Sequence, residues 1–364
     1  MPTVANGDAE AAKTLDEEKL HAFVGKMLGD MGGALSAPLV LIGDKLGLYQ
    51  AMAEAGPVDS PGLAARTGTS ERYIREWLAA QAASGYVEYD EAADRYFLTP
   101  EQEAVFANEE SPAFLAGFFD IAAAAFRAEP KIADAFLSGK GLGWHEQHGC
   151  LFRGTERFFR TSYNHNLVGS WLPALEGVVE RLDQGAVVAD VGCGHGASTV
   201  LMAKAFPNSR FHGFDYHAPS IEHAREAARD AGVGERTVFE QASAASYPGD
   251  GYDLVTFFDC LHDMGDPVGA ARHVRETMAP HGTWMIVEPF AHDETCKNFN
   301  PVGRVYYSAS TLICTPASLS QEVGLALGAQ AGPARLREVV TAGGFTRFRQ
   351  ATATPFNLVL EARP

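Results

Sequence analysis

The carboxyl-terminal half of the chain alternates apolar runs of strand length with stretches of helical periodicity. The predicted strands are AVVADVG, RFHGFD, TVFEQAS, YDLVTFFDCLHD, GTWMIVEPF and FNLVLEARP, and the predicted helices are STVLMAKAF, APSIEHAREAARDAG, PVGAARHVRETMAP and ARLREVVTAGGF. Because such alternation is typical of a parallel sheet covered on both faces, we expect an α/β, Rossmann-like doubly wound domain over residues 186–364. Residues 296–332 interrupt the pattern with aromatic and small residues, which predicts an insertion that covers the active site.

Residues 1–110 show a different pattern, in which short helical periods precede two strand-like pieces. We expect a helix over residues 61–67, a turn at Gly68 and a second helix that begins after a cap at Ser70. Four residues should share one face of the second helix: Tyr73, Ile74, Trp77 and Leu78. The segment YVEYDEAADRYFL predicts a hairpin, and helix, turn, helix and hairpin in that order form a winged helix. Residues 111–185, rich in aromatic side chains, predict a helical connector or lid.

Composition narrows the class of protein. A chain of 364 residues is longer than a single domain with one hydrophobic core usually is, so we expect more than one domain. The chain has no apolar run near the ~18 residues that a membrane span needs. The amino terminus lacks a basic region followed by an apolar stretch, so we expect a cytoplasmic protein. Five scattered cysteines without C-x-x-C spacing argue against a disulfide framework and a zinc site. The net charge of −17 makes nucleic acid an unlikely partner.

The segment VADVGCGHGAST joins the first predicted strand of the α/β domain to its first helix. It reads D-x-G-x-G-x-G through Asp190, Gly192, Gly194 and Gly196, which is neither a dinucleotide fingerprint nor a phosphate-binding P-loop. A carboxylate would repel a pyrophosphate but attract an ammonium group. Asp215 ends the next strand, where an acidic side chain can accept hydrogen bonds from ribose hydroxyls. Together these features indicate a nucleoside that bears an amino acid.

This pattern resembles the class I S-adenosylmethionine-dependent methyltransferases, and the resemblance extends over nearly the whole chain. It implies S-adenosyl-L-methionine as the cofactor, with the glycine loop close to its methionine part and Asp215 on the ribose. Asp190 would contact the amino group directly or through water, and Tyr216 with the turn at 241–243 would flank the adenine. The cofactor-binding residues implied in this way are Asp190, Gly192, Cys193, Gly194, Gly196, Asp215, Tyr216, Gln241, Ala242, Ser243, Phe258, Asp259 and Tyr163.

The winged helix, the connector and the α/β domain together resemble the dimeric small-molecule O-methyltransferases of plants and bacteria. In that family a histidine of a His-Asp pair removes the proton of the acceptor hydroxyl, and His262 and Asp263 match the pair. Glu288 matches the carboxylate that orients the histidine. The chain departs from plant members at Met264, where they carry a large aromatic residue, and Glu322 is only a candidate for their second carboxylate. The phrase FDCLHDMGDP is similar to actinobacterial and mycobacterial members whose substrates are mostly unassigned.

The same resemblance implies a homodimer and a small-molecule acceptor. We expect residues 15–110 to form most of the dimer contact, because the stretch GGALSAPLVLIGDKLGLYQAM is too apolar to stay exposed. Cys193 is expected to be a small packing residue rather than a nucleophile. His145, Glu146 and His148 predict a polar loop rather than a metal site, since no third ligand is adjacent in sequence.

Three alternatives stay open at this stage. His262 could be a helix-capping or core histidine without a role in proton transfer. The methylated atom could be nitrogen, sulfur or carbon instead of oxygen. The chain could also be a transcription regulator that senses S-adenosylmethionine and binds DNA through its winged helix. The regulator is disfavoured because Arg72 and Arg75 of the recognition helix are offset by Glu71 and Glu76.

Overall fold

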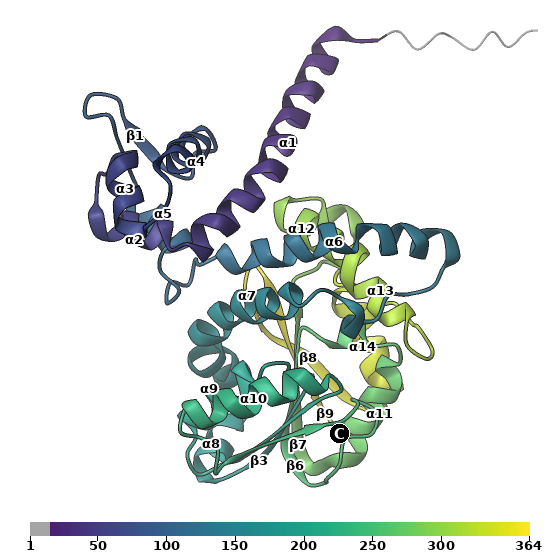
Figure 1. Ribbon diagram of the computed structural model, residues 1–364. Coiled ribbons are helices and arrows are strands. Elements are labelled where there is room, and N and C mark those ends of the chain that lie inside the picture. Colours follow the sequence, from purple (N-terminus) through teal and green to yellow (C-terminus); the bar gives the residue numbers. More distant parts are fainter. Residues whose placement is uncertain (1–14) are drawn as a thin grey trace, which may run out of the picture. The chain divides into compact units, whose positions relative to one another are not determined.

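The computed structural model describes residues 15–364, which divide into one unit that ends at Glu103 and a second from Ala104 to Pro364 (Figure 1). The described elements of the first unit are α1 (Glu17–Lys45), α2 (Leu48–Ala55), α3 (Ser60–Thr67), α4 (Glu71–Ala83), β1 (Glu88–Asp90) and β2 (Arg95–Phe97). The two strands pair as an antiparallel hairpin, and a bridge joins Val58 to Tyr96. The order of helix, turn, helix and hairpin is the predicted winged helix.

Helix α4 presents one apolar face to the core of the first unit. Ile74, Trp77 and Leu78 are buried, whereas Tyr73 is 80% exposed, so the prediction that Tyr73 shares this face was wrong. The buried positions of α4 continue to Gln81, and positions 74, 77, 78 and 81 have the spacing of one helix face. Residue 73 precedes the first of them by one position and points away from this face. Ser70 occupies the N-cap position as expected, although its side chain makes no capping hydrogen bond.

The apolar stretch over residues 32–52 supplies part of this core. Its later large side chains are buried: Val40, Leu41, Leu48, Tyr49 and Met52. The most exposed apolar side chains of α1 include three that lie before or at the start of that stretch, namely Phe23, Leu28 and Met31, together with Leu35. The exposed apolar surface therefore begins earlier in the chain than the sequence suggested. Among the described residues no single helix is long and apolar enough to cross a membrane, although the bent pair α1 and α2 together meets the criteria of length and composition.

The second unit is built on a seven-stranded sheet in the order β5-β4-β3-β6-β7-β9-β8. Its strands are β3 (Val187–Val191), β4 (Arg210–Asp215), β5 (Thr237–Gln241), β6 (Tyr252–Phe258), β7 (Met278–Pro289), β8 (Arg347–Ala353) and β9 (Asn357–Arg363). The first five strands in this order are parallel, and β9 runs antiparallel to both of its neighbours. The strand β8 was not predicted, because its segment RFRQATA mixes charged and small residues and alternates only weakly.

Helices cover both faces of this sheet, with α9 and α10 on one side and α11 and α14 on the other (Figure 1). The helices from the end of the first unit onward are α5 (Pro100–Phe106), α6 (Ala116–Ser138), α7 (Cys150–Asn166), α8 (Val178–Gln184), α9 (Ala197–Ala205), α10 (Ala218–Asp230), α11 (Pro267–Thr277), α12 (Pro301–Ala309), α13 (Thr315–Leu319) and α14 (Gly332–Ala342). Met285 and Val287 of β7 pack with α9 and α10, whereas Trp284 and Ile286 pack with α11 and α14. This strict alternation is what a strand buried on both faces requires.

Two segments outside the sheet pack on each other. The connector contributes α6 and α7, and the insertion contributes α12, a π-helical turn over Ser310–Cys314 and α13. Ile121 of α6, Leu151 of α7 and Ile313 of the π-helical turn share one buried cluster. Because this cluster holds the insertion against the connector, both segments are fixed at the carboxyl end of the parallel strands.

Candidate active site

A cavity of about 420 Å³ lies within the second unit, at the carboxyl ends of the parallel strands. Its lining comes from the loop after β3, the end of β4, the turn after β5, the end of β6, helix α7 and residues of the insertion. This is the edge of an open α/β sheet at which ligands bind, because the strand order reverses there between β3 and β6.

The glycine loop after β3 lines the cavity through Gly192, Cys193 and Gly194. Gly194 has a positive φ of 52°, and a side chain there would point into open space rather than into protein. Gly196 has φ of 80° and does not line the cavity; an added Cβ would lie 2.9 Å from Ala224 of α10. The first two glycines and Cys193 are therefore placed for ligand contact, whereas Gly196 allows α9 and α10 to approach each other.

The structure places Asp190 beneath the loop and not in the cavity. The residue is 1% exposed, and its Oδ2 accepts hydrogen bonds of 2.6 Å from Ser198 and Thr199 of α9. Its Oδ1 accepts a third, of 3.0 Å, from Thr256 of β6. Burial raises the pKa of Asp190, and the three hydroxyls oppose that rise. Both carboxylate oxygens therefore serve to join β3, α9 and β6. This geometry argues against a direct contact of Asp190 with a ligand, and the contact through water stays a prediction.

Asp215 at the end of β4 takes the position that the sequence predicted. Its Oδ2 accepts a 3.0 Å hydrogen bond from the backbone N–H of Gly194, and its Oδ1 accepts one of 2.8 Å from His217. Tyr216, Ala242 and Ser243 also line the cavity. Gln241 does not, because its side chain donates to the carbonyl of Tyr216 on the outside of this turn.

Phe258, Asp259 and Tyr163 meet at the end of β6 and line the cavity together. Tyr163 of α7 donates a 3.3 Å hydrogen bond to Asp259, and Asn357 of β9 donates one of 3.2 Å to the other carboxylate oxygen. Asp259 has a positive φ of 50°, an uncommon backbone conformation that clusters at functional sites. Burial raises the pKa of Asp259 well above its ordinary value.

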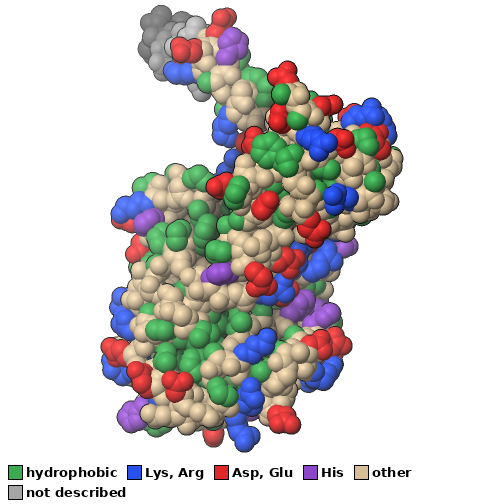
Figure 2. Space-filling model, turned by 90° about the vertical axis from the view of Figure 1, so that its left-hand side faces the viewer, with side chains coloured by type: hydrophobic (Ala, Val, Ile, Leu, Met, Phe, Trp, Pro, Cys, Tyr) green, Lys and Arg blue, Asp and Glu red, His purple; other side chains and the backbone are tan. Residues whose placement is uncertain are grey.

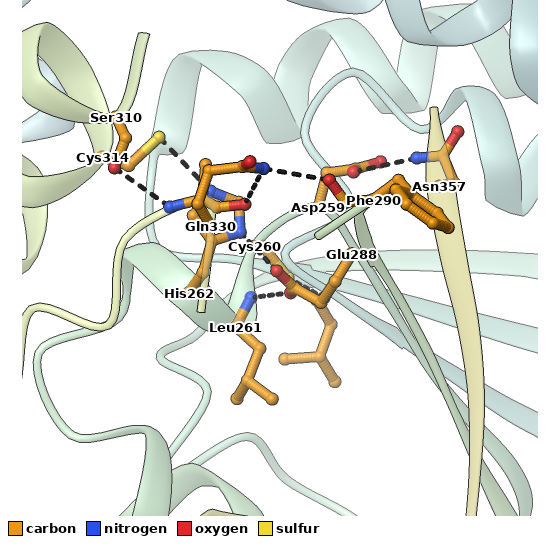
Figure 3. A network of polar contacts seen from close by, with 12 residues as sticks. Asp259, Cys260, Leu261, His262, Glu288, Phe290, Ser310, Cys314, Gln330 and Asn357 are labelled. Carbon is orange, nitrogen blue, oxygen red and sulfur yellow. Dashed lines mark hydrogen bonds and ion pairs between the residues drawn. The ribbon is translucent and has the colours of Figure 1, made fainter. Parts of the chain in front are cut away.

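His262 lies next to the cavity in a short 3₁₀ turn over Leu261–Asp263 and contacts two groups from other segments (Figure 3). Its Nδ1 is 2.5 Å from Oε2 of the buried Glu288, which lies one residue before the end of β7. The other oxygen of Glu288 accepts a 3.0 Å hydrogen bond from the backbone of Leu261. On the far side of the ring, Nε2 is 3.3 Å from the Sγ of Cys314. The sequence predicted the first contact but gave no signal for Cys314, which follows His262 by 52 residues.

The pKa values of the ionisable side chains around His262 depend on one another. Burial alone would lower the pKa of His262, but the carboxylate of Glu288 and the thiol of Cys314 raise it well above the ordinary value. Burial raises the pKa of Asp263 to about 7, an effect that His262 partly opposes. Asp263 lines the cavity, whereas His262 and Glu288 lie behind it. Glu322 is exposed and Cys314 holds the place beside His262, so the candidate second carboxylate was wrong.

Helix α7 adds cavity residues that the sequence did not single out. Thr155, Glu156 and Phe159 lie on the helix face that also carries Tyr163. Their spacing of three and four residues is a helical stripe, but aromatic stripes more often mark a core than a ligand site. Burial raises the pKa of Glu156, against the effect of Arg160. Glu156 is the carboxylate on α7 that lines the cavity.

The histidines of the segment GWHEQHG do not act together. His145 lines the cavity, whereas the Nδ1 of His148 lies near Arg127 and Cys150. Within residues 15–364 no group of three or more His, Cys, Asp and Glu side chains could hold a metal ion.

The acidic lining fits a cationic ligand. Four carboxyl groups border the cavity: Glu156, Asp215, Asp259 and Asp263. A positive charge among them would gain attraction at short range in a partly dehydrated site, whereas a phosphate would be repelled. Asp215 also presents its carboxylate at the edge of the sheet where ribose hydroxyls can donate to it. The residues present therefore fit a nucleoside that carries a positive charge.

Two known family models match segments of this chain. Residues 182–326 match a methyltransferase domain, and residues 34–108 match the Rv2258c-like winged HTH domain.

Known proteins match this chain partially in sequence and extensively in fold. The 27-O-demethylrifamycin SV methyltransferase of Amycolatopsis mediterranei is 32% identical over 103 residues, which are 28% of this chain and 38% of that protein. The chain spans only 23% to 38% of the length of the first curated relatives it matches. Human N-acetylserotonin methyltransferase in complex with SAM superposes with a TM-score of 0.70 at 17% identity and covers 97% and 99% of the two chains. An O-methyltransferase family protein from Burkholderia thailandensis gives a TM-score of 0.65 at 16% identity and covers 96% and 98%. At these identities the likeness shows the fold.

Proposed function

We propose that the chain is an S-adenosylmethionine-dependent methyltransferase that methylates a hydroxyl of a small-molecule acceptor. The matches of residues 182–326 to a methyltransferase domain and of residues 34–108 to a winged HTH domain support this proposal. His262 would act as the general base. The observation that carries this proposal is the buried contact of 2.5 Å between its Nδ1 and Glu288, beside the carboxyl ends of β6 and β7. A histidine held in this way has a fixed ring and a fixed tautomer.

The cofactor is S-adenosylmethionine, whose sulfonium supplies an electrophilic methyl group when it is bound. Gly192 and Gly194 would lie against its methionine part, and Glu156 would accept hydrogen bonds from its ammonium group. Asp215 would hold the ribose, and Tyr216 with the turn at residues 242–243 would flank the adenine. Asp259 and Asp263 lie near His262 in the chain and line the cavity, and in their ionised forms they would offset the positive charge.

The proton path begins at His262. A carboxylate can only accept hydrogen bonds, so Nδ1 carries a proton toward Glu288 and Nε2 presents its lone pair. The acceptor hydroxyl would take the position that Cys314 now holds beside Nε2 and would give up its proton there. Glu288 would then stabilise the imidazolium. This arrangement favours oxygen over nitrogen, sulfur or carbon, because a hydroxyl is the weak nucleophile that most needs a base.

The test compares His262→Ala with the wild type on a panel of phenols, alcohols, amines and thiols. We expect the variant to lose about 10²- to 10⁴-fold in kcat on the hydroxyl acceptor and to keep its affinity for S-adenosylmethionine in calorimetry. The matched control is His281→Ala, which alters an exposed histidine near the start of β7 and should change neither quantity. Full turnover by His262→Ala would contradict the role of base and would favour a nucleophile that needs no proton removed.

A further inference from the structure

The imidazole of His262 contacts a thiol on one side and a carboxylate on the other, those of Cys314 and Glu288 (Figure 3). The Sγ of Cys314 is 3.3 Å from Nε2 of His262, and Nδ1 of the same ring is 2.5 Å from Glu288. Because Nδ1 donates to the carboxylate, Nε2 is the acceptor and the thiol is the donor. Glu288 is buried and also bound by the backbone of Leu261, so the carboxylate is fixed in place.

We propose that Cys314 is a modification site, an activated thiol that undergoes exchange with a low-molecular-weight disulfide and thereby masks His262. An imidazole that is supported by a carboxylate draws the proton from a neighbouring thiol, and the thiolate is the nucleophilic form of cysteine. In the exchange the proton of the thiol passes to Nε2 and the thiolate attacks one sulfur of the disulfide. A new S–S bond forms, the old one breaks, and the other half leaves as a thiolate that then takes a proton from water.

The remaining cysteines lack this combination of partners and access. Cys193 and Cys260 border the cavity among carboxylates, and burial raises the pKa of each thiol well above its ordinary value. Cys150 lies 3.0 Å from His148 but is buried. Cys296 is exposed and serves as an internal reference. Cys314 is partly exposed and contacts a histidine that is itself bound to a carboxylate.

The consequence for catalysis rests on the proposed function of His262. Since Sγ itself is 3.3 Å from Nε2, a group attached to the sulfur would obstruct the place that the acceptor hydroxyl needs. The residues that line the cavity do not include Cys314, so the modification leaves the side chains expected to hold the cofactor in place. Modification should therefore stop methyl transfer and leave cofactor binding intact.

The experiment treats the full chain at pH 7 with 5,5′-dithiobis(2-nitrobenzoate), an aromatic disulfide, and follows the rate at each cysteine by peptide mass spectrometry. A free thiol is only a few per cent thiolate at pH 7, so full ionisation can raise its rate by at most about 30-fold, less the nucleophilicity lost as its pKa falls. We expect His262→Ala to slow the reaction at Cys314 by about ten-fold and to leave Cys296 unchanged. Glu288→Gln should slow Cys314 by a smaller factor, which keeps the test sharp if His262→Ala does not fold.

Calorimetry with S-adenosylhomocysteine reports both folding and the state of the cavity in every variant. The modified wild type should bind it as tightly as before and lose methyl transfer, while Cys314→Ser should lose nothing on the same treatment. A rate at Cys314 that is unchanged or faster in His262→Ala and Glu288→Gln would overturn the activated thiol. Full methyl transfer by the modified wild type would overturn the masking. Failure of the proposed function would look different, since His262→Ala would then keep its turnover while Cys314 still depended on His262.

Discussion

At the scale of single residues, the partners of His262 shift its titration to higher pH. The carboxylate of Glu288 and the thiol of Cys314 overcome the effect of burial and raise the pKa of His262. A general base must be unprotonated, so its activity appears only as the pH rises through its pKa. The ordinary value for histidine is about 6.5, and the active form should therefore dominate only at pH values above that range.

We predict that kcat/KM for the acceptor rises with pH and that its midpoint lies above the ordinary histidine range. Glu288→Gln removes the carboxylate that raises this pKa, so the midpoint should move to lower pH while the plateau falls. The measurement is the pH dependence of kcat/KM, which reports groups of the free enzyme. An identical midpoint in wild type and Glu288→Gln would show that His262 is not the group that titrates.

Asp190 of β3 and Asp215 of β4 should respond differently to substitution. Asp215→Ala removes a cavity carboxylate and should weaken binding of S-adenosylhomocysteine by at least about ten-fold. Asp190→Ala strands the hydroxyls of Ser198, Thr199 and Thr256 and should lower the free energy of unfolding by about 2 kcal/mol. Calorimetry and urea denaturation measure the two effects. Equal losses of affinity at equal stability would mean that Asp190 reaches the ligand after all.

At the scale of elements, α4 is the helix that would enter DNA if the winged helix were a reader of sequence. Its Arg75 pairs with Glu71 at 2.8 Å and its Arg72 with Glu76 at 2.7 Å, each on the same helix. Side chains of both signs of charge are present on the face of the molecule shown in Figure 2. Contacts with phosphate need unneutralised positive charge, which α4 does not offer.

We therefore predict no binding to duplex DNA at 0.15 M salt. Fluorescence anisotropy with a labelled random duplex, with and without S-adenosylmethionine, should stay flat up to micromolar protein. The double variant Glu71→Gln, Glu76→Gln frees both arginines and is the matched positive arm, in which weak, salt-sensitive binding should appear. Submicromolar binding of the duplex by the wild type would contradict this prediction and would favour the transcription regulator.

The elements differ in how far their sequence predicted them. The strand β3 is apolar on both faces and precedes a glycine loop, so its place and its ligand edge follow from local pattern. The strand β8 does not, because its charged and small residues alternate only weakly. The antiparallel entry of β9 does not either, because its pairing with the distant β7 decides it. The same holds in the site: Asp215 and His262 follow from motifs, whereas Glu156 and Cys314 reach the site through helix packing that leaves no local signature.

At the scale of the whole molecule, α1 leaves an apolar seam exposed within the first unit. Val24, Leu28, Met31 and Leu35 are exposed and follow the spacing of four and three residues that defines the contact positions of a coiled coil. Side chains of this kind in water favour association, and most soluble homo-oligomers are symmetric dimers. A second copy of α1 would cover the seam with identical chemistry.

We predict a homodimer at micromolar concentration that depends on this seam. Leu28→Glu with Leu35→Glu places like charges on both copies of the contact and should convert the dimer to a monomer in sedimentation velocity. Because both side chains are exposed, the substitutions should leave the fold intact, and the circular dichroism spectrum of the chain should not change. The control is Tyr73→Glu, an equally exposed apolar position on α4 outside the seam, which should sediment as a dimer. A wild type that sediments as a monomer would contradict the homodimer, and a seam variant that stays dimeric would show that the contact lies elsewhere on the chain.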